Sequence, residues 1–326
     1  MSEVSSFEMK SIGRSSLTVP PLCFGTTSLG DMPNTYGYSV DEDRAKETVQ
    51  AIFDGPAKFL DSSRNYGAGR SEARVGEVIR ERGGLPKGVI ISTKLDRDME
   101  TLRFDAARAR QSLEESLKAL NLDRVHLLHL HDPEYAADLD EVTGKGGAIE
   151  ELFKMKEEGL ADAVGLAAGR TDIMIPILKS WDFDALITHN RFTLINRHGE
   201  PMMNLAYERG IAILNAAPYS GGVFAKGTAE HPRYVYQEAS DAMLEPVRRI
   251  EAICARHQVP PGALALQFSM RDERVASTIC GVSKAERVQQ TVDWANWPIA
   301  DEVWEEIATV PFSTDDPEAT RAYQPD

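Results

Sequence analysis

The 326-residue sequence has little cysteine and little positive charge. Its three cysteines, Cys23, Cys254 and Cys280, form no Cys-x-x-Cys pair, so neither a disulfide framework nor a structural zinc site is indicated. The 36 Lys and Arg residues are outnumbered by 51 Asp and Glu residues, which gives a formal net charge of −15. This balance argues against a nucleic-acid partner, because phosphate backbones need a basic protein face.

Long apolar runs and flexible linkers are also missing. No apolar stretch approaches the roughly 18 residues of a membrane-spanning helix, and the polar start, residues 1–6, does not resemble a signal peptide. No Ser/Gly linker or low-complexity tract divides the chain. We therefore expect a soluble, cytoplasmic protein without a membrane partner, folded as a single domain over residues 1–326. The acidic, proline-containing residues 313–326 are expected to form a mobile tail or to fold over the pocket.

What the chain does contain is a series of short apolar segments that end in a polar residue. Phe59-Leu60 stops at Asp61, and Tyr66 follows five positions later. The next two such segments, residues 87–94 and 124–132, close on Lys94 and on His131. Short apolar runs of this kind are typical of buried parallel strands, and amphipathic helical stretches separate them. In a barrel of parallel strands, catalytic residues gather at the carboxyl ends of the strands.

These strand ends together indicate proton-transfer chemistry. Taken singly, Asp61 could cap the next helix and Tyr66 could be an ordinary loop aromatic. A lysine inside an apolar rim, however, needs a carboxylate partner such as Asp61. A lysine close to Tyr66 would also favour the phenolate and lower the tyrosine pKa below its reference value of about 10. We expect His131 to reach the site, His129 to lie one layer deeper in the core, and His126 to face the helices.

At Asp61, Tyr66, Lys94 and His131 the chain resembles the aldo-keto reductase superfamily in residue type and order. The resemblance extends from the opening hairpin to the last strand near Ile279. It implies an α/β fold, a (β/α)8 TIM barrel with an N-terminal β-hairpin, and a nicotinamide coenzyme bound without a Rossmann domain. It also implies hydride exchange between a carbonyl and an alcohol, in which Tyr66 is the general acid or base, Lys94 lowers its pKa, Asp61 holds Lys94 and His131 orients the substrate oxygen.

The resemblance further implies a coenzyme site built from several strand ends. Its expected contacts are Gly25, Thr26, Asp61, His189, Asn190, Tyr219, Ser220, Gly222, Gly281, Val282, Ser283, Arg287 and Gln290. Ala167 and Ala168 stand where the family usually has a serine and an asparagine that hold the nicotinamide carboxamide. We therefore expect His189 or Asn190 to hold it, with Asn190 favoured because an amide both donates and accepts. Ala216 stands near the position of the usual stacking aromatic.

The last strand and its loop predict the coenzyme and the branch of the family. Gly281 and Val282 stand where NADP-selective members usually have a lysine and a serine, and only Arg287 of that set is kept. NAD or NADP is expected as coenzyme, with NAD used well. These departures resemble the branch of aldose, L-fucose and pyridoxal dehydrogenases. The predicted substrate is therefore a small carbonyl or hemiacetal compound, namely an aldose such as L-fucose or D-arabinose, or pyridoxal, oxidised to the lactone.

Two other interpretations stay open at this stage. One is a metal-dependent hydrolase on the same barrel, in which His129 and His131 share a strand face, Asp61 bridges and Lys94 is a modified ligand. No late strand end completes that ligand set, so we expect no metal. The other is a channel-type auxiliary subunit that binds coenzyme without turnover. Of the remaining segments, residues 26–40 are expected to help form the substrate pocket, residues 223–238 to form a flap, and residues 294–307 to form one final helix.

Overall fold

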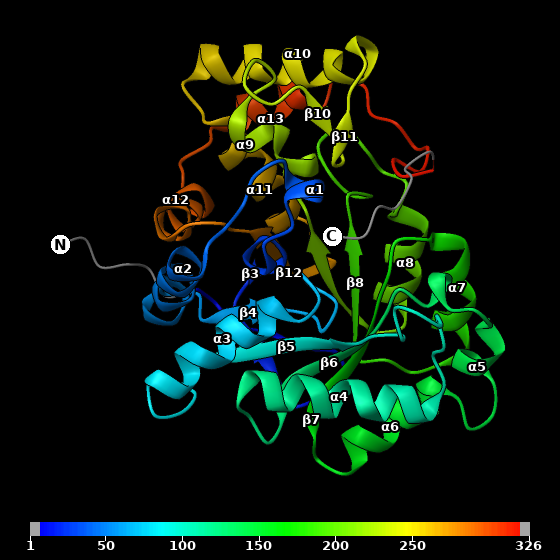
Figure 1. The fold of residues 1–326 in the computed structure, drawn as a ribbon. Helices are drawn as coiled ribbons and strands as arrows, with labels where there is room; N and C mark the ends of the chain where they lie inside the picture. The colour runs from blue at the N-terminus through cyan, green and yellow to red at the C-terminus, as the bar shows by residue number, and fades with distance from the viewer. Residues whose placement is uncertain (1–6, 320–326) are drawn as a thin grey trace.

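The computed structural model describes residues 7–319, and its centre is a closed barrel of parallel strands (Figure 1). Around the barrel the order is β12, β3, β4, β5, β6, β7, β8, β9. The strands are β3 (Leu22–Gly25), β4 (Phe59–Asp61), β5 (Ile90–Leu95), β6 (Val125–His131), β7 (Ala161–Ala167), β8 (Ala185–His189), β9 (Ala212–Ala216) and β12 (Val275–Gly281). The predicted (β/α)8 barrel is confirmed.

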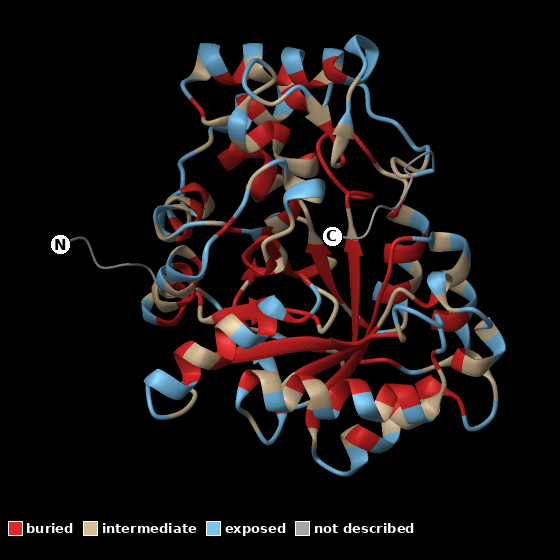
Figure 2. Cartoon of the chain, viewed as in Figure 1, coloured by how far each residue is buried: buried red, intermediate tan, exposed pale blue. Residues whose placement is uncertain are grey.

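Amphipathic helices cover the outside of the barrel. In α2 (Glu42–Asp54) the side chain of Asp41 accepts a hydrogen bond from the Arg44 amide at the helix start, and Val49, Ile52 and Phe53 are among the residues buried against the sheet. Figure 2 shows the same division, with buried strands inside and helices exposed on their outer faces. The other long helices are α3 (Arg70–Glu81), α4 (Ala106–Leu120), α6 (Ala148–Glu157), α7 (Thr171–Ser180), α8 (Glu200–Glu208), α10 (Asp241–His257), α11 (Pro261–Met270) and α12 (Ala285–Ala295).

The predicted N-terminal hairpin lies at the amino ends of the barrel strands. It pairs β1 (Lys10–Ser11) with β2 (Thr18–Val19). Its apolar residues Ile12 and Val19 are buried in the same cluster as Leu127 of β6. The Lys10 ammonium donates to the carbonyl of Val275, the first residue of β12. The hairpin therefore closes the end of the barrel opposite to the predicted site.

Short elements are folded into the loops and the final helical region. They are η1 (Thr27–Gly30), α1 (Pro33–Tyr36), η2 (Pro133–Tyr135), α5 (Leu139–Thr143), η3 (Ser220–Gly222), α9 (Val223–Lys226), β10 (Arg233–Tyr234), β11 (Gln237–Glu238) and α13 (Asp301–Ile307). The single final helix predicted over 294–307 is wrong, because α12 ends at Ala295 and α13 begins at Asp301. Pro298 lies in the break, where it lacks the amide hydrogen that a continuous helix requires.

No helix within residues 7–319 combines the length and apolar character that crossing a membrane requires. The part of the predicted tail that lies at 320–326 is outside the described residues.

Candidate active site

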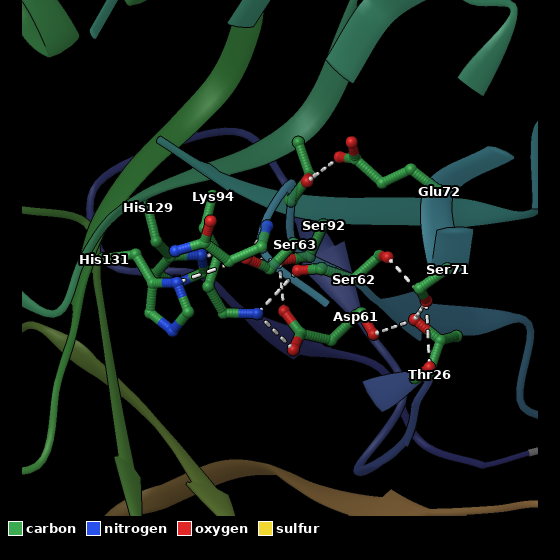
Figure 3. Close-up of polar contacts among 12 residues, drawn as sticks. Thr26, Asp61, Ser62, Ser63, Ser71, Glu72, Ser92, Lys94, His129 and His131 are labelled. Atoms are coloured by element: carbon green, nitrogen blue, oxygen red, sulfur yellow. Dashed lines mark hydrogen bonds and ion pairs between the residues drawn. The ribbon is translucent and has the colours of Figure 1, made fainter. Parts of the chain in front are cut away.

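Lys94 and Asp61 form a buried ion pair at the carboxyl ends of β5 and β4 (Figure 3). The Lys94 ammonium donates to the Asp61 carboxylate and to the Ser62 carbonyl, each over 2.6 Å. Ser92, which precedes Lys94 by two residues and so shares its strand face, donates to the other Asp61 oxygen over 2.8 Å. Burial favours a neutral lysine, but Asp61 and Tyr66 together outweigh burial and raise the pKa of Lys94 above its ordinary value. Lys94 is therefore a fixed cation with a fixed partner.

Tyr66 lies beside this pair in the loop after β4. The Lys94 ammonium is 4.7 Å from the centroid of the Tyr66 ring, and the Tyr66 and His131 rings meet edge to face with centroids 5.9 Å apart. The turn is tight because Gly67 has φ of +59°, and a Cβ on it would lie 1.9 Å from the Gly30 carbonyl oxygen. The close approach of Gly67 to Gly30 thus holds the tyrosine loop in place.

The prediction that Lys94 lowers the pKa of Tyr66 below its ordinary value is wrong for this structure. Burial raises the pKa of Tyr66, and this effect outweighs the attraction of Lys94 for a phenolate. Asp61 opposes the phenolate as well, because its negative charge offsets that of the lysine ammonium. Tyr66 therefore rests as the neutral phenol.

His131 is held by a carboxylate that the sequence analysis did not single out. Its Nδ1 lies 2.6 Å from an Asp96 oxygen, and the other Asp96 oxygen accepts from the Ser63 hydroxyl and the Asn65 amide. Burial favours the neutral imidazole, but Asp132 and Asp96 outweigh burial and raise the pKa of His131. The available signal was strand alternation, because Asp96 follows Lys94 by two residues and so faces the same side.

Of the other two histidines of β6, His129 lies in the core as expected. His129 is fully buried one layer below the site, where its Nδ1 is 3.4 Å from the Ser92 hydroxyl and burial holds its pKa well below the ordinary value. His126 accepts a hydrogen bond from the Ile91 amide. Within residues 7–319 no group of three or more His, Cys, Asp or Glu side chains could hold a metal ion. The metal-dependent hydrolase therefore finds no support.

Tyr66, Lys94 and His131 open on one cavity of about 320 Å³ at the carboxyl ends of the barrel strands. The predicted site residues on its wall are Gly25, Asp61, Tyr66, Lys94, His131, His189, Tyr219, Gly222, Gly281, Ser283 and Arg287. The predicted coenzyme contacts that do not line it are Thr26, Asn190, Ser220, Val282 and Gln290. The Thr26 hydroxyl, for example, donates to the Asp61 carbonyl and supports the site from behind.

Comparison with known proteins agrees with this architecture. A model of the aldo/keto reductase family matches residues 21–310. The chain belongs to this family. Pyridoxal 4-dehydrogenase of Microbacterium luteolum is 26% identical, over 91% of this chain and 95% of that protein. D-threo-aldose 1-dehydrogenase of a Pseudomonas species is 28% identical, over 90% and 94%. The holo form of the aldo-keto reductase AKR11C1 from Bacillus halodurans superimposes with a TM-score of 0.77 at 20% identity, covering 97% of this chain and all of that one.

As a member of the aldo/keto reductase family, the protein is an oxidoreductase that uses a nicotinamide coenzyme. The part of the cavity wall that contains Tyr219, Gly222 and Gly281 suits a nucleotide. Gly221 and Gly222 have φ of +78° and +106°, and a Cβ on Gly281 would meet no atom within 4 Å. Within residues 7–319, the hydroxyls of Tyr219, on the wall, and of Ser220, which does not line the cavity, are buried without a hydrogen-bond partner. Open backbone at Gly281 and the unsatisfied Tyr219 hydroxyl on the wall suit a phosphate-bearing ligand.

Cations that the sequence analysis did not place also reach this wall of the reductase. Lys226 and Arg233, from residues 223–238, line the cavity together with Arg287. Arg44 of α2 donates to the backbone carbonyl of Ser283 over 2.6 Å and to its hydroxyl over 3.2 Å. Arg287 donates to the amide oxygen of Gln290. Residues 223–238 were expected to form a flap, and they supply part of the cavity wall.

The two side chains expected to hold the nicotinamide carboxamide contact residues near the end of the described chain. Asn190 has φ of +59°, is fully buried, and donates from its amide to Glu318 over 3.0 Å. His189 does line the cavity, and its Nε2 is 3.1 Å from the same carboxylate. Burial favours a protonated Glu318, but His189 and Arg191 outweigh it and hold the pKa of Glu318 well below its usual range. Of the two candidates for the carboxamide, only His189 faces the cavity.

Proposed function

We propose that this protein is a dehydrogenase that oxidises a cyclic hemiacetal, of an aldose or of pyridoxal, to the lactone, reversibly and with NAD. The observation that carries the proposal is the meeting of Tyr66 with Lys94, Asp61 and His131 at the wall of one cavity. A phenol between a fixed cation and an imidazole is equipped to exchange a proton with a substrate oxygen. The bound coenzyme supplies the acceptor for the substrate hydride.

Each polar side chain has a definite part in moving the proton. Tyr66 takes the proton of the substrate hydroxyl in oxidation and returns it to the carbonyl oxygen in reduction. Its neutral resting form suits the donor role directly, and a positive charge entering the cavity would favour the phenolate that oxidation needs. Asp96 accepts from Nδ1 of His131, so Nε2 donates to the substrate oxygen when the imidazole is protonated, the form that Asp132 and Asp96 favour.

Two further features support the choice of a ring-shaped substrate. The two relatives compared above are named as dehydrogenases of pyridoxal and of aldoses. The cavity also has an aromatic wall, where the Tyr36 ring lies 5.9 Å from Tyr38 and 5.8 Å, edge to face, from Tyr236. Aromatic faces pack well against flat or weakly polar ring faces.

The preference for NAD rests on the adenosine end of the cavity. Gly281 and Val282 offer no charged side chain for an additional phosphate. Arg287 is already bonded to Gln290, and Arg44 is bonded to Ser283. NADP would have to draw these arginines from their present partners, whereas NAD leaves them in place.

The test is reduced-nicotinamide absorbance with NAD and NADP against a panel of aldoses and pyridoxal, with the product identified by mass. We expect lactone formation with NAD, and loss of turnover in Tyr66→Phe. Activity confined to the reduction of simple aldehydes would contradict the hemiacetal assignment. Coenzyme binding without turnover on any carbonyl or alcohol would instead favour the auxiliary-subunit interpretation.

A further inference from the structure

Arg97 is a buried cation, and two of its nitrogens have no hydrogen-bond partner within residues 7–319. It follows β5 by two residues, is 4% exposed, and lines the same cavity as Tyr66 and His131. Its Nε and Nη1 atoms are buried and meet no hydrogen-bond acceptor in the part of the chain that the structure describes. Leaving donors of a charged group unsatisfied in a protein interior is costly, so such a group at a cavity wall points to a ligand.

The guanidinium of Arg97 lies against an aromatic ring. The guanidinium carbon lies 5.0 Å from the centroid of the Tyr135 ring. A cation–π contact of this kind uses the flat face of the guanidinium and leaves the N–H groups at its edge. The preceding residue, Asp96, is fully engaged with His131, Ser63 and the Asn65 amide. The Asp96 carboxylate is therefore not available to pair with Arg97.

The charge on the cavity wall is unusual for so acidic a chain. Among the described residues, the lining carries five Lys or Arg side chains but only two carboxylates, those of Asp61 and Asp132, although the chain as a whole has a formal net charge of −15. Asp61 is taken by Lys94. The remaining cations other than Arg97, which are Lys226, Arg233 and Arg287, come from the segments that we assign to the coenzyme. Arg97 lies on the β5 side, with Tyr66 and His131.

We propose that Arg97 binds an anionic group, a carboxylate or a phosphate, carried by the substrate whose reacting carbon faces Tyr66 and His131. This inference rests on the proposed function and narrows its substrate class to acidic carbonyl or hemiacetal compounds. Nε and a terminal nitrogen of arginine form a planar fork that pairs with two oxygens of one anion. Asp132, also on the wall, accepts from substrate hydroxyls and disfavours a second anionic group near His131.

The first test uses aldehyde reduction, which does not depend on hemiacetal oxidation. The probes are 4-carboxybenzaldehyde and 4-methylbenzaldehyde, which differ mainly in charge, assayed with reduced coenzyme on the wild type, Arg97→Gln and Arg97→Lys. The wild type should prefer the carboxylate, and Arg97→Gln should lower its kcat/KM by about 10- to 100-fold but that of the methyl compound by less than about 3-fold. Arg97→Lys, which keeps the charge without the fork, should fall between. Equal losses on both aldehydes, or no preference in the wild type, would overturn the inference.

The second test is equilibrium binding, which needs no turnover. Calorimetric titration of the coenzyme-loaded wild type with benzoate and with benzamide should show a preference for benzoate. Arg97→Gln should lose that preference, or Arg97→Lys should weaken it if the glutamine variant does not fold, while coenzyme affinity stays constant as the folding control. Equal affinity of the wild type for both compounds would contradict an anion site.

The third test separates this inference from the proposed function and identifies the anion. Galactose, galacturonate and galactose 6-phosphate are compared as substrates with NAD. Oxidation of either acidic sugar over the neutral one supports both proposals and tells carboxylate from phosphate. A charge preference among the aldehydes with no sugar oxidised would keep the Arg97 site and remove the aldose hemiacetal as substrate. If galactose is oxidised as well as the acidic sugars, and no test shows a charge preference, the hemiacetal assignment is kept and the Arg97 anion site is removed.

Discussion

The two halves of the cavity wall are built differently. At the ends of β4, β5 and β6, the side chains around Tyr66 are held by hydrogen bonds within the protein, which join Lys94 and Ser92 to Asp61 and His131 to Asp96. At the ends of β7 and β9 the wall is methyl groups from Ala167, Ala168 and Ala216. The proton-transfer side chains are thus held in position before any ligand binds. The half assigned to the coenzyme instead depends on the coenzyme and on distant segments of the chain for its polar partners.

Removing the Tyr66 hydroxyl should abolish proton transfer at the β4, β5 and β6 side of the wall. We expect Tyr66→Phe to lower kcat by about 10³-fold or more, since the general acid or base is lost. Coenzyme affinity, followed by quenching of protein fluorescence, should stay within about twofold because the other half is untouched. Tyr36→Phe is the matched control on the aromatic wall, with less than about a threefold loss expected. Full turnover by Tyr66→Phe would remove the proton-transfer assignment.

Removing the charge of Asp96 should reduce activity at the β4, β5 and β6 side of the wall without abolishing it. Asp96 raises the pKa of His131, so Asp96→Asn should lower that pKa and shift the loss of activity with rising pH to lower pH. We also expect kcat/KM for aldehyde reduction to fall by about 10- to 100-fold, as a lost charge-assisted hydrogen bond implies. The pH profile of kcat/KM measures both effects.

Asp132→Asn is the comparison for the Asp96 variant. Asp132 also raises the pKa of His131, but it is 3.6 Å from Nε2 and half-exposed, whereas Asp96 is fully buried and in contact at 2.6 Å. The shift of the pH profile should therefore be smaller for Asp132→Asn. A profile that is unchanged in Asp96→Asn would show that the carboxylate only packs against the ring.

The two halves also differ in how far the sequence predicts them. Asp61, Lys94 and His131 end consecutive strands, so strand periodicity alone brings them together. Glu318 could not be predicted in the same way, because it meets Asn190 from 128 positions along the chain. The choice between His189 and Asn190 turned on a left-handed backbone at Asn190 that no local residue pattern demands. The sign of the Tyr66 pKa shift required the balance of burial against Lys94 and Asp61, which needs coordinates.

Neutralising Glu318 should weaken coenzyme binding at the half of the wall assigned to the coenzyme. Glu318 holds His189, Asn190 and Arg191 together, so Glu318→Gln should raise the KM for coenzyme by about 5- to 10-fold, the range of one partly buried charged contact. The kcat at saturating coenzyme should change little. Asp316→Asn is the matched control, because Asp316 contacts Arg191 at 2.7 Å without an ion pair to His189. An equal rise in both variants would mean that the tail only anchors Arg191.

The smallest expected effect concerns the adenosine end. Arg287→Met should lower kcat/KM with NADP by about 3- to 10-fold and with NAD by less, because a partly exposed cation that is already bonded to Gln290 contributes little to a phosphate contact. Arg44→Met gives the comparison, since Arg44 contacts Ser283 from α2. If Arg44→Met changes the ratio of NADP to NAD use more than Arg287→Met does, the coenzyme preference is set by α2. Arg287, at the position on α12 that the family uses, would then matter less than Arg44. The adenosine end of the wall, like the end that Glu318 supports, would depend on a residue far away in the sequence.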